Sequence, residues 1–398
     1  MAEVHDKVRP APVGAPASSG WWAVAAVSTG IFTVVTSEML PVGLLTPIGD
    51  ALQVSEGTAG LTLMVTGLVA AISAPLVTPA LGTLDRRIAL CGLMALLAGA
   101  NLLAAWAPGF AVMVVARVLV GIAMGGIWSL AAGIAVRLVP AGSVGRGTAL
   151  IFSGIAVASV LGVPAGTFLG ELLGWRSTFA VIAGLAAVVA VAMAVLLPPL
   201  PAERAAGLGG IARLLGNARV ATGLAVVVLL VTGHFGAYTY VRPVLEQLGR
   251  LDAALVGTLL LVYGIAGVVG NFVAGAAAQR SVRATLQVLC GLVACAVLLL
   301  ALLGTSAAGS AVALVVWGLA YGGVSVGVQT WLMAAAPDAR EMASSLFAGV
   351  FNAAIALGAL AGGRVVDGFG APAVLAWAGA LAVGALVVVA LGRAPARR

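Results

Sequence analysis

Long apolar runs dominate the chain, and short polar segments separate them. A helix needs about 20 apolar residues to cross the hydrocarbon core of a bilayer. Twelve runs reach this length, near residues 21–45, 58–80, 88–106, 110–134, 148–170, 176–197, 219–241, 254–277, 284–303, 310–333, 343–366 and 372–392. The pattern therefore predicts an all-α membrane protein with twelve transmembrane helices.

The composition supports a lipid environment. Of the 398 residues, 62% are hydrophobic and only 8% are charged, whereas soluble domains carry about 25% charged residues. So few charges cannot cover a water-soluble surface, so the apolar excess must face lipid. The 54 glycines suit helices that pack closely within a membrane.

The longest polar segment inside the chain opens with the sequence Pro-Pro-Leu-Pro at residues 198–201. It divides the apolar runs into two groups of six. The first residues lack the layout of a cleavable signal peptide. We predict a disordered cytoplasmic tail, a six-helix bundle, a cytoplasmic linker, a second six-helix bundle and a short cytoplasmic tail, at residues 1–20, 21–197, 198–218, 219–392 and 393–398.

The distribution of basic residues predicts the orientation, because cytoplasmic loops carry an excess of lysine and arginine. With the N-terminus inside, the outer segments hold four basic residues: Arg176, Arg242, Arg250 and Arg364. The cytoplasmic segments then hold fifteen: Lys7, Arg9, Arg86, Arg87, Arg137, Arg146, Arg204, Arg213, Arg219, Arg280, Arg283, Arg340, Arg393, Arg397 and Arg398. Both termini are expected in the cytoplasm.

The two halves show a weak internal repeat with an offset of 196 positions. Three residues near the end of the fifth run have counterparts in the eleventh, namely Gly162, Gly166 and Glu171, which correspond to Gly358, Gly362 and Asp367. Internal repeats with a binding site between them recur among secondary transporters.

Four local patterns carry a resemblance to a known family. They are Thr-Ser-Glu-Met-Leu-Pro-Val-Gly-Leu-Leu at 36–45, Gly-Thr-Leu-Asp-Arg-Arg at 82–87, Arg-Val-Leu-Val-Gly at 117–121, and Gly-Val-Pro-Ala-Gly at 162–166 followed by Gly-Trp-Arg at 174–176. The chain resembles the major facilitator superfamily, and within it the bacterial drug:proton antiporter and sugar-efflux branch. The second pattern departs from the family signature, because it is one residue shorter and lacks the second glycine.

The resemblance implies a fold and several roles. It implies two pseudo-symmetric six-helix bundles around a central cavity. It also implies that Gly82, Asp85, Arg86 and Arg87 form a gating loop that holds the cytoplasmic side closed. The alternative for these arginines is topology alone, since they also obey the positive-inside bias.

The fifth apolar run carries the antiporter motif that the resemblance implies. Its members are Gly154, Gly162, Pro164, Gly166 and Gly170. The glycines form a smooth groove, and the proline removes a backbone donor and bends the helix. One interpretation is a bendable contact between the two halves, and the other is ordinary close packing of helices.

Three ionisable residues lie well inside predicted spans, where they are expensive and suggest function. Glu38 lies about 6 Å, and Arg117 about 7 Å, to the outer side of the centres of their helices, at 1.5 Å per residue. We expect the two to interact, directly or through water, and to couple proton movement to transport. The alternative is a static buried ion pair that fixes packing. His234 lies at a similar depth and could join a proton relay, or could be a packing residue.

Further polar and aromatic positions predict the wall of a substrate cavity. Tyr238 follows His234 by one turn, and Tyr321 and Gln329 share a face of their helix. The full expected cavity set is Glu38, Trp128, His234, Tyr238, Asn271, Tyr321, Gln329 and Asn352. The two asparagines could instead bridge helices.

Several function classes lack their sequence signals. The three cysteines, Cys91, Cys290 and Cys295, lie in apolar runs without metal-ligand spacing. No catalytic cluster and no phosphate-binding loop of a nucleotide-driven pump occurs, no basic cluster with interleaved aromatics suits nucleic acid, and the loops are too short for a receptor's signalling domain. We therefore expect no enzyme, no cofactor, no bound metal and no nucleic-acid partner.

The expected protein is a secondary active transporter in a bacterial cytoplasmic membrane, surrounded by lipid and monomeric. Its predicted activity is proton-coupled efflux of a small amphipathic solute by alternating access. Candidate solutes are drugs such as amphenicol antibiotics, sugars and nucleosides, and the sequence does not choose among them. The alternative on the same fold is a proton-coupled importer or a uniporter.

Overall fold

The computed structural model describes residues 17–201 and 214–393, and all regular secondary structure in these two ranges is helical. The helices are α1 (Ala17–Leu52), α2 (Glu56–Ala80), α3 (Arg86–Ala105), α4 (Phe110–Leu138), α5 (Val144–Leu173), α6 (Trp175–Leu196), α8 (Ala218–Tyr238), α9 (Val241–Gly249), α10 (Ala253–Leu303), α11 (Ala307–Gly322), α12 (Val324–Ala335), α13 (Arg340–Phe369) and α14 (Ala373–Leu391). Short 3-10 turns, Ala141–Ser143 and Pro337–Ala339, precede α5 and α13.

The twelve predicted spans correspond to these helices. Eleven helical segments of the described chain are long and apolar enough to cross a membrane. One of them, α10, supplies two spans, because Ser281 has non-helical backbone angles (φ −158°, ψ 97°) that break it. The α11–α12 pair counts as one span, Ala307–Ala335, with its break at Gly323. The prediction of twelve spans in an all-α fold is confirmed.

Helix α1 is longer than predicted at both ends. It begins at Ala17 and ends at Leu52, whereas the apolar run covers residues 21–45. A span predicted from hydropathy ends with the last apolar residue. This helix continues beyond that point, through an exposed last turn that contains Asp50. The rest of the predicted N-terminal tail, most of the predicted linker and all but one residue of the C-terminal tail lie outside the described residues.

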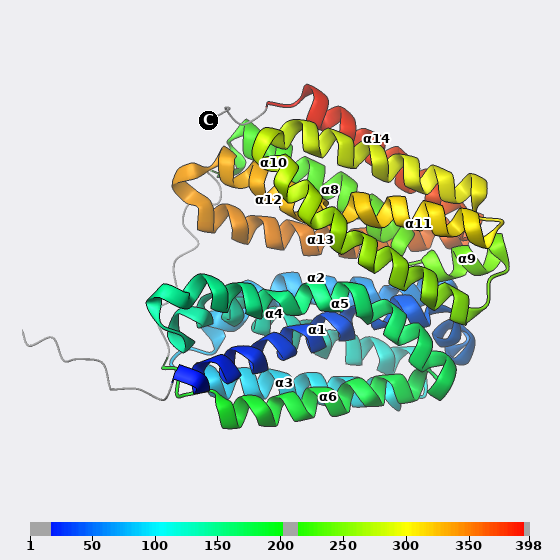
Figure 1. Ribbon diagram of the computed structural model, residues 1–398. Helices are drawn as coiled ribbons and strands as arrows, with labels where there is room; N and C mark the ends of the chain where they lie inside the picture. The colour runs from blue at the N-terminus through cyan, green and yellow to red at the C-terminus, as the bar shows by residue number, and fades with distance from the viewer. Residues whose placement is uncertain (1–16, 202–213, 394–398) are drawn as a thin grey trace, which may run out of the picture.

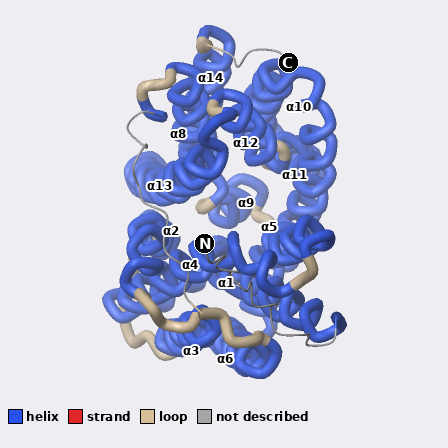
Figure 2. The backbone as a smooth tube through the Cα atoms, turned by 90° about the vertical axis from the view of Figure 1, so that its left-hand side faces the viewer, coloured by secondary structure: helices blue, strands red, loops and turns tan. Residues whose placement is uncertain are grey.

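The helices form two bundles side by side. Figure 1 shows α1–α6 in one layer and α8–α14 in the other, and Figure 2 shows the same two groups along the helix axes. We call them the first half and the second half. Across the seam between them, α2 packs against α13, and α5 packs against α10.

The internal repeat is visible in the backbone. Helices α5 and α13 each have 30 residues, each follows a 3-10 turn, and all their bounds differ by 196 positions. Each ends at a glycine with positive φ, Gly174 at 80° and Gly370 at 86°, and the next helix begins within three residues. Such a backbone favours glycine, since a Cβ atom crowds that conformation. The offset predicted from three residue pairs therefore extends over whole helices.

The seam is tight at one end of the molecule and looser at the other. We call these the α9 end and the terminus end, the latter holding the start of α1 and the end of α14 (Figure 1). Along α13, Gly363 packs on Gly57 of α2, whereas a Cβ atom added at Gly349, near the terminus end, would meet no heavy atom within 4 Å. Along α10, Gly264 packs on α5, and two turns further Asn271 is exposed. The helix pairs therefore diverge toward the terminus end.

Candidate functional site

Glu38 lies on the side of α1 that faces the second half. Val42 and Leu45, one and two turns further along the same side of the helix, belong to the hydrophobic core of the second half. The Glu38 side chain is only 3% exposed, and its Oε1 atom has no hydrogen-bond partner among the described residues. A buried carboxylate without partners is costly while charged, so this group is suited to bind a proton or a hydrogen-bonding solute.

Arg117 is fully buried in the first half and is held by a backbone carbonyl of α1. Its Nη1 donates to the Ser37 carbonyl at 2.9 Å, and its guanidinium lies 5.0 Å from the ring centre of Phe179. The Ser37 carbonyl is free because its normal helical partner would be the N–H of residue 41, which is proline and has none. The sequence of α1 thus creates the acceptor that Arg117 uses.

Glu38 and Arg117 are brought to the same region without direct contact. Their charges interact, but no ion pair within 4.0 Å joins them. The Nε and Nη2 atoms of Arg117 have no partner among the described residues. Both groups therefore keep hydrogen-bonding capacity for a third group between them.

Asn101 of α3 supports this region, and the sequence analysis missed it. Its Oδ1 accepts a hydrogen bond from the Ser37 hydroxyl at 2.9 Å, and its Nδ2 donates to the Leu97 carbonyl at 2.8 Å. Asn101 is completely buried. An amide in the middle of an apolar run was the available signal.

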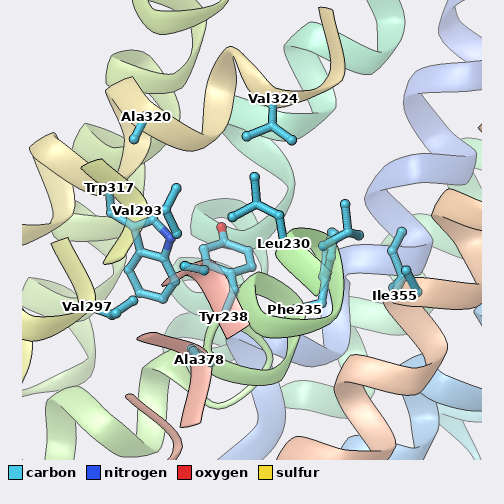
Figure 3. Close-up of a cluster of buried hydrophobic side chains, with 14 of the residues drawn as sticks. Leu230, Phe235, Tyr238, Val293, Val297, Trp317, Ala320, Val324, Ile355 and Ala378 are labelled. Carbon is cyan, nitrogen blue, oxygen red and sulfur yellow. The ribbon is translucent and has the colours of Figure 1, made fainter. Parts of the chain in front are cut away.

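His234 lies in an aromatic cluster in the second half. Its ring stacks on Tyr321 with centroids 3.2 Å apart and on Tyr238 at 5.2 Å, and Phe235 meets it edge-on at 4.9 Å. Figure 3 shows Tyr238, Phe235 and Trp317 among the surrounding buried side chains. Three of the four tyrosines of the chain belong to this cluster.

Trp317 determines which nitrogen of His234 carries the proton. The indole Nε1 donates to His234 Nδ1 at 3.1 Å, so Nδ1 is an acceptor and the neutral ring carries its proton on Nε2. Neither Trp317 nor Tyr263 was predicted. Trp317 lies one turn before Tyr321 on α11, which was the signal that could have found it.

The other expected cavity residues are spread along the seam and the helices around it. Trp128 stacks on Phe152 of α5 with centroids 6.0 Å apart, and its indole nitrogen has no partner among described residues. Gln329 reaches Ser344 of α13 at 3.4 Å.

The two predicted asparagines differ in their surroundings. Asn352 donates to the Ala348 carbonyl of its own helix, α13, at 2.9 Å. Asn271 is exposed on the side of α10 that faces α5 nearer the α9 end. Their role as cavity residues stays a prediction.

The glycine motif of α5 does not lie between the two halves. A Cβ atom at Gly154, Gly162, Gly166 or Gly170 would meet residues of α1. Pro164 lies inside the same helix. The interpretation of these glycines as a contact between halves is therefore wrong in its geometry, because the groove they form accepts α1 of the same bundle. The α5 residues that pack against glycines of α10 are instead Ser159, Val160 and Phe168.

The predicted gating loop is tied to the end of the first half. Asp85 caps α3 by accepting from the Arg87 backbone N–H at 2.7 Å, and it also accepts from the Leu200 N–H at 2.9 Å. The Arg87 guanidinium donates to the Ala194 carbonyl at the end of α6. Arg86 is buried, and Gly82 has a positive φ of 48° that forms the turn. These contacts anchor the loop, and its gating role stays a prediction.

The comparisons with known proteins agree with this architecture. The sequence profile described as Major Facilitator Superfamily matches residues 27–347 and 251–398. A purine ribonucleoside efflux pump, NepI of Salmonella paratyphi B, is 34% identical over 387 residues, which cover 97% of both chains. The proteins of the same name from Salmonella enteritidis and Salmonella typhimurium are 34% and 33% identical over the same shares.

Two solved structures share the fold at lower identity. A bacterial homologue of the human lysosomal transporter Spinster, in an inward-facing and unoccupied conformation, has a TM-score of 0.71 and 14% identity, and the match covers 94% of this chain and 95% of that one. The human organic anion transporter MFSD10 has a TM-score of 0.64 and 17% identity, with coverage of 94% and 100%. The profile match and the full-length relatives establish the family: this chain is a solute transporter, not an enzyme, and it belongs to the Major Facilitator Superfamily.

Proposed function

We propose that the protein exports purine ribonucleosides in exchange for protons. The observation that carries this proposal is the similarity, over 97% of both chains, to proteins named purine ribonucleoside efflux pumps. Secondary transporters of this kind place the solute between two repeats and alternate its access to either side. Residues on both sides of the seam supply suitable chemistry.

The aromatic cluster of the second half suits a purine base. Stacking of a base on an aromatic side chain contributes about 1–3 kcal/mol. Tyr321 is half-buried, stacks on His234 and has a hydroxyl without a partner among the described residues. Phe351 of α13, also half-buried, lies near the same cluster through Phe235. The base would stack here, and the ribose hydroxyls would donate to Glu38 across the seam.

Coupling follows from competition for Glu38. The carboxylate is buried, and the Arg117 charge nearby favours its ionised form. A bound proton would neutralise the buried carboxylate, and a solute hydroxyl would stabilise it by donating a hydrogen bond. Because both use the same carboxylate, binding of one displaces the other. Alternating access would then carry the proton inward and the nucleoside outward.

The basic residues support the direction. Fifteen lie in the segments predicted to be cytoplasmic and four in the segments predicted to lie outside, and this bias supports a cytoplasmic location for the terminus end. We propose a monomer in the bacterial cytoplasmic membrane with both termini inside. The divergence of the helix pairs then opens toward the cytoplasm.

The test uses purified protein in liposomes with radiolabelled adenosine and an imposed pH gradient. The intact protein is expected to move adenosine against its gradient when protons flow the opposite way. Glu38→Gln is expected to abolish this proton-driven movement, whereas Asp50→Asn, an exposed acid on the same helix, should leave it unchanged.

Two results would contradict the proposal separately. Proton-driven adenosine movement that survives Glu38→Gln would overturn the role of Glu38. Transport of chloramphenicol or a sugar, with no transport of purine ribonucleosides, would overturn the solute assignment. The direction of the pH gradient that drives net adenosine movement distinguishes exchange from proton-coupled import. In exchange, adenosine moves opposite to the protons, and in import it moves with them.

A further inference from the structure

The short helix α9 lies between the two halves and is largely buried. Figure 2 shows it in the centre of the view along the axes, flanked by both bundles. Val241, Val244 and Leu245 are buried in the core that the second half shares with α1. We propose that α9 is the gate that closes this end of the solute pathway, and that Arg242 is the residue that holds the gate shut.

Arg242 links α9 to the first half. Its side chain is 6% exposed, its Nη1 donates to the Gly43 carbonyl of α1 at 2.6 Å, and its Nη2 lies 3.4 Å from Glu171 Oε1 on α5. Its Nε donates to Glu246 of α9 itself at 2.7 Å. One guanidinium therefore binds two helices across the seam and one acid on its own helix.

The Gly43 carbonyl is available because of a proline. Its helical partner would be the N–H of residue 47, and Pro47 has none. The freed carbonyl lies at the surface of α1 that α9 covers, and a nearly buried guanidinium needs such acceptors. Glu246 adds a second tie, since its Oε2 accepts from the Thr46 hydroxyl at 2.7 Å.

A second connection at the same end comes from the repeat. Asp367 on α13, the counterpart of Glu171, accepts from the Gly57 N–H and from the Ser55 hydroxyl, both at 3.0 Å. It therefore caps α2 from the other half, and carboxylates are favourable at helix N-termini. The two equivalent acids, Glu171 and Asp367, thus each make a contact across the seam at the α9 end, and α9 lies between them.

The arrangement allows α9 to move away from the first half while the Arg242 guanidinium keeps a paired carboxylate. Arg242 and Glu246 are four residues apart on one helix, so their ion pair moves with α9. Among the polar contacts of α9 with the first half, opening exchanges the Gly43 carbonyl, Glu171 and Thr46 for water, and it also breaks the 3.4 Å hydrogen bond that Gln247 donates to Glu56 of α2. Each of these contacts involves a charged group, and such hydrogen bonds are stronger than neutral ones. Their loss should therefore shift the equilibrium between the closed and open positions of α9 by a measurable amount.

The experiment measures access to both ends in full-length protein held in lipid nanodiscs, with the native cysteines replaced. One reporter is Leu45→Cys, which is completely buried near α9, and the other is Gly349→Cys at the terminus end. A polar maleimide reports how often each site is exposed. Arg242→Met is expected to raise labelling at position 45 about tenfold, as loss of hydrogen bonds to a charged group predicts, and to lower it at position 349.

Matched variants separate a gate from general loosening. Arg250→Met removes an exposed arginine just after α9 and should change neither rate. Glu171→Gln alters a half-exposed partner and should leave the fold intact, so a smaller rise at position 45 is expected even where Arg242→Met fails to fold. Unchanged labelling at position 45 in Glu171→Gln and in any folded Arg242→Met, or a rise at both reporters together, would overturn the proposal.

Discussion

The contact between α10 and α11 offers a sharp test of packing, through the substitution Gly322→Ala. A Cβ atom at Gly322 would overlap the Gly267 carbonyl of α10, and at Gly270 it would overlap the Leu319 carbonyl of α11. The obstructing atoms are backbone, so they cannot rotate away. The two helices must separate, and overpacking of this kind costs about 1–3 kcal/mol.

The expected result is a lower free energy of unfolding and weaker adenosine binding. The second effect follows because Tyr321 precedes Gly322, so moving α11 displaces the ring that stacks on His234. The measurements are unfolding in mixed micelles and binding of radiolabelled adenosine. Gly349→Ala is the matched control, since its Cβ would meet nothing within 4 Å, and alanine there should be neutral or stabilising by up to about 1 kcal/mol.

The two outcomes refute different steps. Equal stability of Gly322→Ala and the parent would show that the helices do not approach as closely as the backbone indicates. A destabilised protein that binds adenosine normally would show that Tyr321 does not contribute to solute binding.

Three further substitutions test the buried polar contacts. Trp317→Phe leaves His234 Nδ1 without its donor, so we expect a loss of about 1–3 kcal/mol in the free energy of unfolding, which His234→Phe in the same background should largely abolish. Gly166→Leu forces a large side chain into the contact with α1, and both membrane expression and adenosine transport should fall; loss of transport alone would show that this contact serves transport beyond packing. Asn101→Leu removes the acceptor of the Ser37 hydroxyl and should slow proton-driven transport in liposomes several-fold while adenosine binding persists; a normal rate would show that this contact is not needed.

The sequence predicted the membrane spans well because runs of about 20 apolar residues mark them, whereas it did not predict where α1 begins and ends. The depth of Glu38 and Arg117 followed from helix rise, and the structure places both in the same region. The direction in which a helix face points was not predictable, since periodicity shows that Gly166 shares a face with its neighbours but not which helix covers that face. Trp317 was missed because a tryptophan in an apolar run looks like any other core residue. Helix α9 was missed because its nine residues are too short and too polar to resemble a span.

The two prolines of α1 have a consequence for how that helix can move. The carbonyls they leave free, at Ser37 and Gly43, are six residues apart, which is about 9 Å along the axis and about 120° around it. One is held by an arginine of its own bundle, Arg117, and the other by an arginine of the second half, Arg242. Helix α1 is thus held by hydrogen bonds at two points on different sides of its axis. A tilt or rotation of α1 that breaks one of these hydrogen bonds strains the other. A movement of α1 at the α9 end therefore also changes the surroundings of Glu38.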